Sequence, residues 1–168
     1  MRARAISVRR ARAGDGAGMA RCWIDAGRHY IDVDQTRFQV PEEVGLDQWF
    51  EASLARRSED RAVFVAERDA ELVGFCGAHL EAPHTEPWRQ LQRDLGRSRL
   101  YVDALAVIEP ARRGGVGQAL MRAAEKWGRE RGASVLFVDS FADGPTSTPF
   151  YEKRMGYSRR SIRFQGPI

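Results

Sequence analysis

Hydrophobic positions along the chain follow two periods, and each period predicts a different kind of element. Alternation with a period of two, which is typical of strands, runs through ISVRRA (residues 6–11) and through segments at about 62–67 and 71–80. The short connection Arg68-Asp69-Ala70 predicts that the last two form an antiparallel hairpin. Further strand patterns follow at LYVDALAVI (100–108), ASVLFVDSF (133–141) and YSRRSIRF (157–164).

Hydrophobic residues spaced three and four apart predict helices between these strands. Asp15 is a candidate N-cap for a first helix, and Pro41 suits the first turn of a second. The segment VGQALMRAAEKWGRERG (116–132) predicts a third helix closed by Gly132, and TPFYEKRM (148–155) a short fourth. A short helical insertion is predicted at residues 83–98, closed by Gly96.

The order strand, helix, strand over residues 100–141 predicts a parallel crossover beside the antiparallel hairpin. The fold class is therefore α/β, with a mixed central sheet of about six to seven strands flanked by about four helices. No repeat or linker divides the sequence, so a single domain over residues 1–168 is expected.

Composition and charge argue against a nucleic-acid or membrane partner but do not identify a function. The net charge of +4 comes almost entirely from arginine, a bias that a GC-rich coding genome would also produce. Because no helix-turn-helix, zinc-finger or RNP signature accompanies the charge, no nucleic-acid partner is expected. No apolar run approaches the roughly 20 residues that span a bilayer, so we expect a soluble, cytoplasmic protein without a membrane partner.

The potential metal ligands and thiols are few. His79, Glu81 and His84 form the only cluster of residue types that bind metals, and side chains of this kind at a strand end are more often solvated, so no metal site is expected. Cys22 and Cys76 lie far apart without a CxxC partner, so we expect no disulfide.

The segment EPARRGGVGQAL (109–120) combines arginine and glycine between a strand and a helix. Backbone N–H groups at a helix start favour an anion, and glycines let a phosphate approach the backbone closely. A nucleotide P-loop is excluded, because no Lys-Ser or Lys-Thr pair occurs in the chain. A dinucleotide fingerprint fails because Leu120 stands where the third glycine belongs. A plain helix-start loop without a ligand remains an alternative.

The triplet Arg112, Gly115 and Gly117 matches the pyrophosphate motif [RQ]-x-x-G-x-[GA], and the chain resembles the GNAT superfamily of acyl-CoA-dependent N-acetyltransferases. PFYEKRMGY (149–157) resembles the family's FYEKLGF segment, and VAERDAELVGF (65–75) its preceding hairpin. The resemblance covers nearly the whole chain and is weakest at 31–45 and 83–98.

This resemblance implies acetyl-CoA as the cosubstrate. Backbone amides from Arg113 to Gly117 would hold the pyrophosphate with the Arg112 side chain, and the Val107 amide would meet the thioester carbonyl. The coenzyme-binding residues so implied are Leu105, Ala106, Val107, Arg112, Arg113, Gly114, Gly115, Val116, Gly117, Ser147 and Tyr151.

Two residues are candidates for proton transfer. Asp103 is expected to be buried on one strand face with Tyr101, Leu105 and Val107, where its raised pKa would suit a general base. A purely structural Asp103 is an equal alternative, and Glu109 or a water could be the base instead.

By resemblance, Tyr151 would protonate the leaving thiolate, although it could also be only a packed aromatic. The sequence departs from the family before this segment, because Gly144 and Ser147 stand where Asn and Ala are common. Ser147 or Thr148 could replace the contacts of the missing Asn.

The implied activity is acetyl transfer to a primary amine of a small molecule or peptide; the alternative is an acyl-CoA-binding sensor without turnover. A homodimer remains open as a further partner. Acidic residues outnumber basic ones in the segment expected to border the acceptor, which favours a cationic amine unless they only cap helices. The acids are Asp25, Asp32, Asp34, Glu42, Glu43 and Asp47, against Arg28 and Arg37.

Overall fold

The computed structural model describes residues 5–56 and 58–167. Two compact units are distinguished by their internal contacts, one up to Val138 and one from Asp139 on. The first unit holds the whole sheet and three helices, and the second holds the short helical segment near residue 150.

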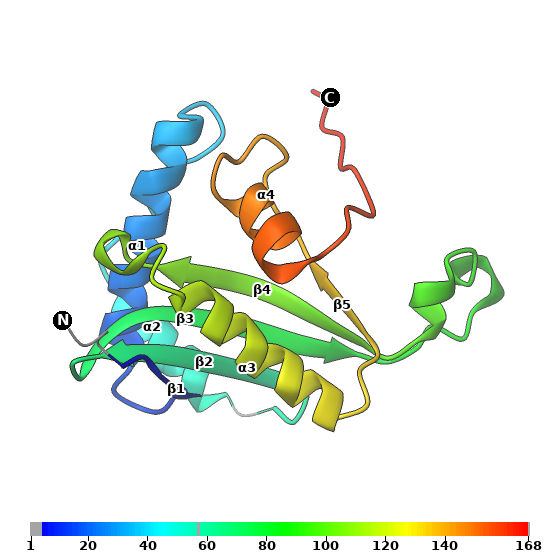
Figure 1. Ribbon diagram of the computed structural model, residues 1–168, viewed down its shortest axis with the longest axis horizontal. Helices are drawn as coiled ribbons and strands as arrows, with labels where there is room; N and C mark the ends of the chain where they lie inside the picture. The colour runs from blue at the N-terminus through cyan, green and yellow to red at the C-terminus, as the bar shows by residue number, and fades with distance from the viewer. Residues whose placement is uncertain (1–4, 57, 168) are drawn as a thin grey trace. The chain divides into compact units, whose positions relative to one another are not determined.

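A mixed sheet forms the centre of the first unit (Figure 1). Its strands lie in the order of the chain. Neighbours are antiparallel from the first strand to the fourth, whereas the fifth runs parallel to the fourth. The predicted hairpin and the parallel crossover are confirmed. The strands are β1 (Ser7–Arg10), β2 (Arg61–Arg68), β3 (Glu71–Glu81), β4 (Arg99–Val107) and β5 (Val135–Val138).

The described residues contain five strands rather than six to seven. The predicted strand at 157–164 is wrong, because this segment has no regular secondary structure. Its only aliphatic and phenyl side chains, Ile162 and Phe164, are 76% and 88% exposed, so a strand here would bury no apolar face.

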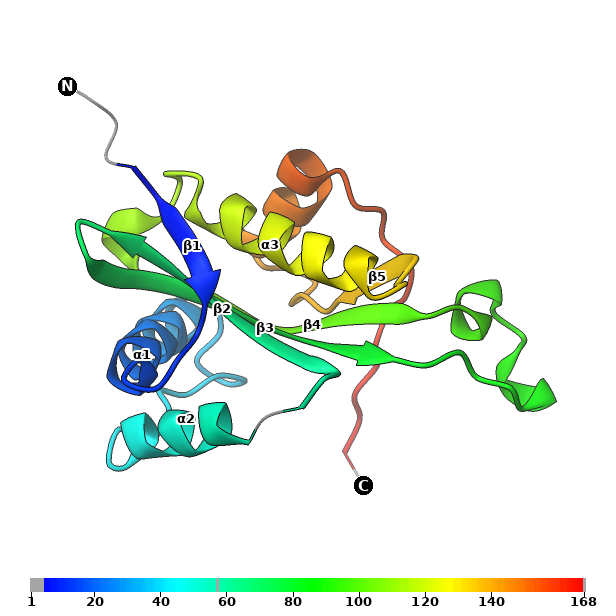
Figure 2. The same ribbon diagram turned by 90° about the horizontal axis from the view of Figure 1, so that it is seen from below.

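Helices cover both faces of the sheet: α1 (Gly16–Val33) and α2 (Leu46–Ala55) lie on one face and α3 (Val116–Glu130) on the other (Figure 2). The α/β class is thereby confirmed. The second helix starts at Leu46 and not at Pro41, which instead packs against α1. A side chain at Gly27 would bring its Cβ within 2.6 Å of Pro41 Cδ.

The hydrophobic core on the α1 and α2 face joins Met19 and Cys22 to Phe50, Phe75 and Ala106. On the other face, Leu120 and Ala124 of α3 are fully buried. Both cysteines are free and buried. Burial raises the pKa of each thiol to about 12, so both stay protonated at neutral pH.

Residues 82–98 project from the adjoining ends of β3 and β4 (Figures 1 and 2). They form two short 3₁₀ turns, Pro87–Arg89 and Arg93–Gly96, in place of one helix. Trp88 and Leu91 remain exposed because the turns are too short to fold an apolar face back onto the unit. Among the described residues, no helix combines the length and hydrophobicity needed to cross a bilayer.

Candidate functional site

The loop between β4 and α3 is built from one 3₁₀ turn and two residues with positive φ. The turn Glu109–Ala111 follows β4, and α3 begins at Val116. Arg113 and Gly115 adopt φ values of 61° and 85°. Successive backbone amides in such left-handed turns converge on one point, an arrangement that attracts anions.

The amides of residues 113–118, in the second half of this loop and the first turn of α3, have no acceptor among the described residues. The first bond of α3 runs from the Ala119 N–H to the Gly115 carbonyl at 3.0 Å. Within the described part of the chain, no oxygen accepts a hydrogen bond from the amides of residues 113–118. Six donors therefore remain at the positive end of a 15-residue helix, which is an anion-binding geometry.

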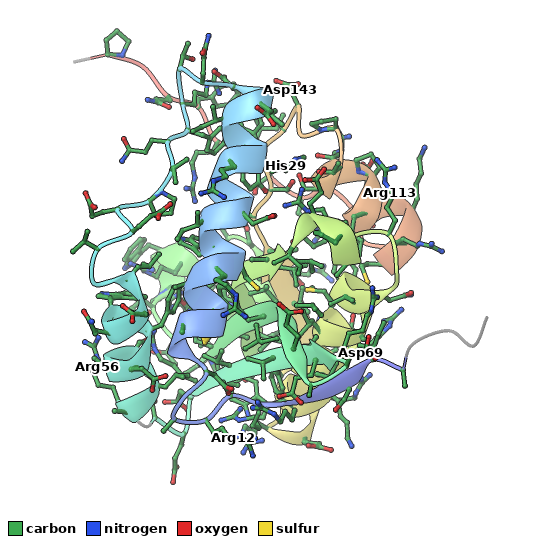
Figure 3. All side chains as sticks on the ribbon, turned by 90° about the vertical axis from the view of Figure 1, so that its left-hand side faces the viewer. Arg12, His29, Arg56, Asp69, Arg113 and Asp143 are labelled. Carbon is green, nitrogen blue, oxygen red and sulfur yellow. The ribbon has the colours of Figure 1, made fainter. Side chains whose placement is uncertain are left out.

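Of the two arginines in the motif, only one is free to face a ligand. Arg112 donates from Nε to the Val107 carbonyl at 2.9 Å and pairs with the Asp25 carboxylate of α1. It therefore ties the end of β4 to α1, and its predicted contact with pyrophosphate stays a prediction. Arg113 is exposed (Figure 3).

A third arginine, Arg68 at the end of β2, was missed by the sequence analysis. Its Nε is buried without a hydrogen-bond partner among the described residues. Its Nη2 lies 2.7 Å from the position that a Cβ at Gly114 would occupy. A partly buried guanidinium whose Nε has no acceptor, directly beside the loop, is the kind of group that an anion would satisfy.

The strand before the loop has an edge that no described strand pairs with beyond Val102, here called the free edge of β4. β5 pairs with β4 only from Arg99 to Val102. The Ile108 amide donates to the Val73 carbonyl at 3.0 Å, and bonded and non-bonded pairs alternate in an antiparallel ladder. Backbone groups of Leu105 and Val107 therefore point away from β3, toward the free edge.

Ala106 differs from its two neighbours. By the same alternation its backbone groups face β3, and its side chain is 2% exposed in the core. Three strand residues are implied by the resemblance for coenzyme binding. Among the described residues, Leu105 and the Val107 amide are left without a backbone partner on this edge, whereas the Val107 carbonyl accepts from Arg112.

Asp103 is not buried as expected, since 45% of its side chain is exposed. The register of β3 against β4 shifts between Gly77 and Ala78, which makes Asp103 an extra, bulged residue. The expected face with Leu105 and Val107 is therefore wrong. Instead, the two carboxylate oxygens of Asp103 lie 2.8 and 2.9 Å from His79 Nδ1, within hydrogen-bond distance.

The residues of the second unit are brought together within that unit. Tyr151 belongs to a π-helical turn, Phe150–Met155, and its ring lies parallel to that of Tyr157 at 6.2 Å. The Ser147 hydroxyl lies 2.7 Å from the Ser140 hydroxyl, and Thr148 donates to the Phe141 carbonyl at 3.2 Å. The predicted roles of Tyr151 and Ser147 remain predictions.

Several acids of the expected acceptor rim have partners. Asp25 pairs with Arg112 of the β4–α3 loop, and Glu43 lies 3.3 Å from Arg28. Just after α1, the Asp34 carboxylate accepts hydrogen bonds from the amide and the hydroxyl of Thr36, and these bonds hold the pKa of Asp34 below its usual value. The rim is therefore less negative than its sequence indicates. No group of three or more metal-binding side chains gathers in the part of the chain that is described.

The family model described as "Acetyltransferase (GNAT) family" matches residues 27–157. No curated protein gives a match. Among solved structures, a mutant of the Bacillus halodurans protein BH1408 has a TM-score of 0.81 at 20% identity, covering 96% of this chain and 99% of that one.

Two further structures carry activities in their names. An aminoglycoside acetyltransferase from an uncultured soil metagenomic sample has a TM-score of 0.63 at 22% identity, with 98% and 99% of the two chains covered. Glucosamine-6-phosphate N-acetyltransferase from Arabidopsis thaliana has a TM-score of 0.66 at 12% identity, with 97% and 98% covered. At these identities the likeness is one of fold.

Proposed function

Since the chain belongs to the acetyltransferase (GNAT) family, we propose that it transfers the acetyl group of acetyl-CoA to a primary amine in a ternary complex. The observation that carries the proposal is the set of unpartnered amides at residues 113–118 beside the free edge of β4. A phosphate-binding loop next to a strand with free amides can hold both ends of an acyl-CoA.

The pyrophosphate would be bound by the loop. Its backbone amides supply donors in a fixed geometry, while Arg113 and Arg68, whose buried Nε has no partner among the described residues, add positive charge. Arg112, held by Val107 and Asp25, would fix the loop against β4 and α1. The residues present therefore fit an anionic coenzyme.

The acetyl group would be positioned by the free edge of β4. The Val107 amide, which points away from β3, can donate to the thioester oxygen and stabilise the negative charge that develops there. Acetyl-CoA supplies the activated acyl group, and the chain contributes orientation of that group beside the amine.

Tyr151 would supply the proton that the departing thiolate needs. The proposal rests on the match of PFYEKRMGY to the family's segment, and on the π-helical turn that carries the residue. A phenol can donate its proton to a thiolate and recover it from water. Ser147 would help to bind the coenzyme.

The acceptor would be a cationic small molecule or a peptide amine. The names of two structurally similar proteins specify aminosugar-type acceptors, which supports an amine but does not identify it. Exposed carboxylates at Asp103 and Glu81, at 45% and 41% side-chain exposure, can attract a cation.

The test has a binding step and a turnover step. Acetyl-CoA should raise Tm, whereas NADH and ATP at equal concentration should not, because the loop lacks their motifs. Thiol release should then follow on addition of spermidine, glucosamine or a lysine-containing peptide. Equal stabilisation by all three nucleotides would refute the assignment, and binding without turnover would favour an acyl-CoA sensor.

Tyr151→Phe separates the acid role from binding. We expect kcat to fall about tenfold or more, with little change in KM for acetyl-CoA, because the phenol acts in the transition state. Tyr157→Phe, which alters the stacked neighbour, is the control and should keep most of the activity. Equal kcat in Tyr151→Phe and the unaltered protein would assign protonation of the thiolate to water.

A further inference from the structure

His79 of β3 and Asp103 of β4 form a side-chain pair outside the phosphate-binding loop. Both carboxylate oxygens lie within hydrogen-bond distance of His79 Nδ1, at 2.8 and 2.9 Å. The pair depends on the bulge, which turns Asp103 to the side of β4 from which it reaches His79. In a regular strand, one of the two side chains would point to the opposite face.

The tautomer of the neutral ring follows from this contact. An ionised carboxylate only accepts hydrogen bonds, so Nδ1 must carry the proton. The lone pair then resides on Nε2, which is the nitrogen available to accept another proton. A carboxylate that holds an imidazole in this way orients the base and stabilises its charged form.

Neighbouring residues fix the ring and supply charge on several sides. Tyr101 stacks on His79 at 5.3 Å with an interplanar angle of 10°. Glu81 Oε1 lies 3.5 Å from Nε2, while its other oxygen accepts from the fully buried Arg99 at 3.1 Å. On β2, Arg61 stands opposite His79. An imidazolium would therefore lie between two carboxylates, with one exposed arginine on the neighbouring strand.

We propose that His79 is the general base of the acyl transfer and that Asp103 positions it. The inference rests on the proposed function, and it names a base other than the candidates from the sequence, which were Asp103, Glu109 and a water. An acceptor ammonium loses one N–H proton, which a new N–H bond at His79 Nε2 takes up. The neutral amine keeps its electron pair for attack on the thioester carbonyl.

The distance between the His79–Asp103 pair and Val107 suits proton transfer through water. Asp103 and Val107 are four residues apart, which corresponds to about 13 Å along a strand. The acceptor and intervening water would fill this span. His79 keeps 23% of its side chain exposed, so the ring can exchange protons with solvent after each turnover.

Matched variants test the assignment. Asn at position 79 can place an amide N–H near the position of Nδ1 and keep the bond to Asp103, but it has no basic nitrogen. His79→Asn should therefore lower kcat about 100-fold, with KM for acetyl-CoA unchanged. In the plot of kcat against pH, measured between about pH 5 and pH 9, the fall in rate on the acidic side should disappear in this variant. Asp103→Asn should shift the pH at which this fall occurs and lower kcat about tenfold.

His84→Asn is the control. His84 has a similar exposure of 26% and also faces a carboxylate, Glu86, at 3.9 Å, but it lies on the projecting segment. Its kcat and profile should stay those of the unaltered protein. A His79→Asn protein that binds acetyl-CoA and keeps the original kcat and pH profile overturns the proposal.

A nitrogen-15 NMR spectrum of the histidine rings gives a readout that needs no acceptor. His79, identified by the signal lost in His79→Asn, should show a protonated Nδ1 and an unprotonated Nε2 at neutral pH. Its tautomer should change in Asp103→Asn. If the protein binds acetyl-CoA but acetylates none of the tested amines, the proposed function fails in its acceptor class. In that case the NMR spectrum alone tests whether Asp103 orients His79. A His79 ring that is protonated at Nε2 and not at Nδ1 overturns the proposal.

Discussion

The two long helices α1 and α3 both begin after a glycine-containing turn, yet their first amides meet different partners. At the start of α1, the Glu51 carboxylate of α2 accepts from the amides of Gly14 and Gly16 at 3.0 and 2.6 Å. At the start of α3, no described oxygen accepts from residues 113–118. One helix start is closed by the protein, and the other is open to an anion.

The arginines beside these two helix starts differ in the same way. Arg9 forms a bidentate ion pair with the Asp15 carboxylate, at 2.7 and 2.8 Å, and also pairs with Glu67. Beside α3, the buried Nε of Arg68 has no hydrogen-bond partner in the part of the chain that the structure describes. Glycine and arginine before a helix therefore do not identify a site by themselves; the site is where neighbouring elements leave donors unsatisfied.

The largest effect is expected from Gly115→Val. Gly115 has φ of 85°, which a β-branched residue adopts only with strain, so the loop should lose its geometry and acetyl-CoA should bind about 100-fold more weakly. Isothermal titration calorimetry measures this change.

Gly132→Val is the matched control at the other end of α3. Gly132 has the same φ of 85°, and a Cβ there or at Gly115 meets no atom within 4 Å. Both variants should therefore lose similar stability, but only Gly115→Val should lose acetyl-CoA. An equal loss of affinity in both would mean that helix stability, and not the open loop, governs binding.

Asp15→Asn tests the closed helix start and should cost about 2 kcal/mol of unfolding free energy at neutral pH. Hydrogen bonds from Arg9 and then from the Arg12 amide hold the pKa of Asp15 below its usual value. This stabilisation is present above the unfolded pKa of about 3.9 and is lost as the pH falls through the lower folded pKa.

Urea unfolding at several pH values measures this dependence. The difference between the unaltered protein and Asp15→Asn should shrink below about pH 4. Asp139→Asn, in the exposed pair with Arg163, is the control and should show no measurable change at any pH. A difference that stays constant down to acid pH would show that ionisation of Asp15 does not stabilise the helix start.

The smallest effect is expected from Arg68→Gln, which removes the positive charge beside the open start of α3. Acetyl-CoA affinity should fall about tenfold, and the fall should be smaller at high salt. Arg56→Gln, at an exposed arginine after α2 (Figure 3), should leave affinity unchanged. If Arg68→Gln binds acetyl-CoA as tightly as the unaltered protein, Arg68 does not contact the phosphates, and the backbone amides and Arg113 bind them without it.

The sequence by itself determined the α/β class, the hairpin, the parallel crossover and the loop before α3. These features depend on local period, turn chemistry and the order of neighbouring segments, which a linear pattern records. It failed at residues 157–164, where alternation occurs without an apolar face to bury, and at Pro41, which packs on α1 instead of starting α2.

Only the tertiary structure decided which of the charged residues are engaged. Arg112 and Asp25 are 87 residues apart in sequence, and His79 and Asp103 are 24 apart. The first pair forms because β4 and α1 meet, and the second because a bulge of one residue changes the side of β4 that Asp103 faces. Sequence periodicity records local spacing but neither a bulge nor a distant partner, so these contacts could not be read from the sequence alone.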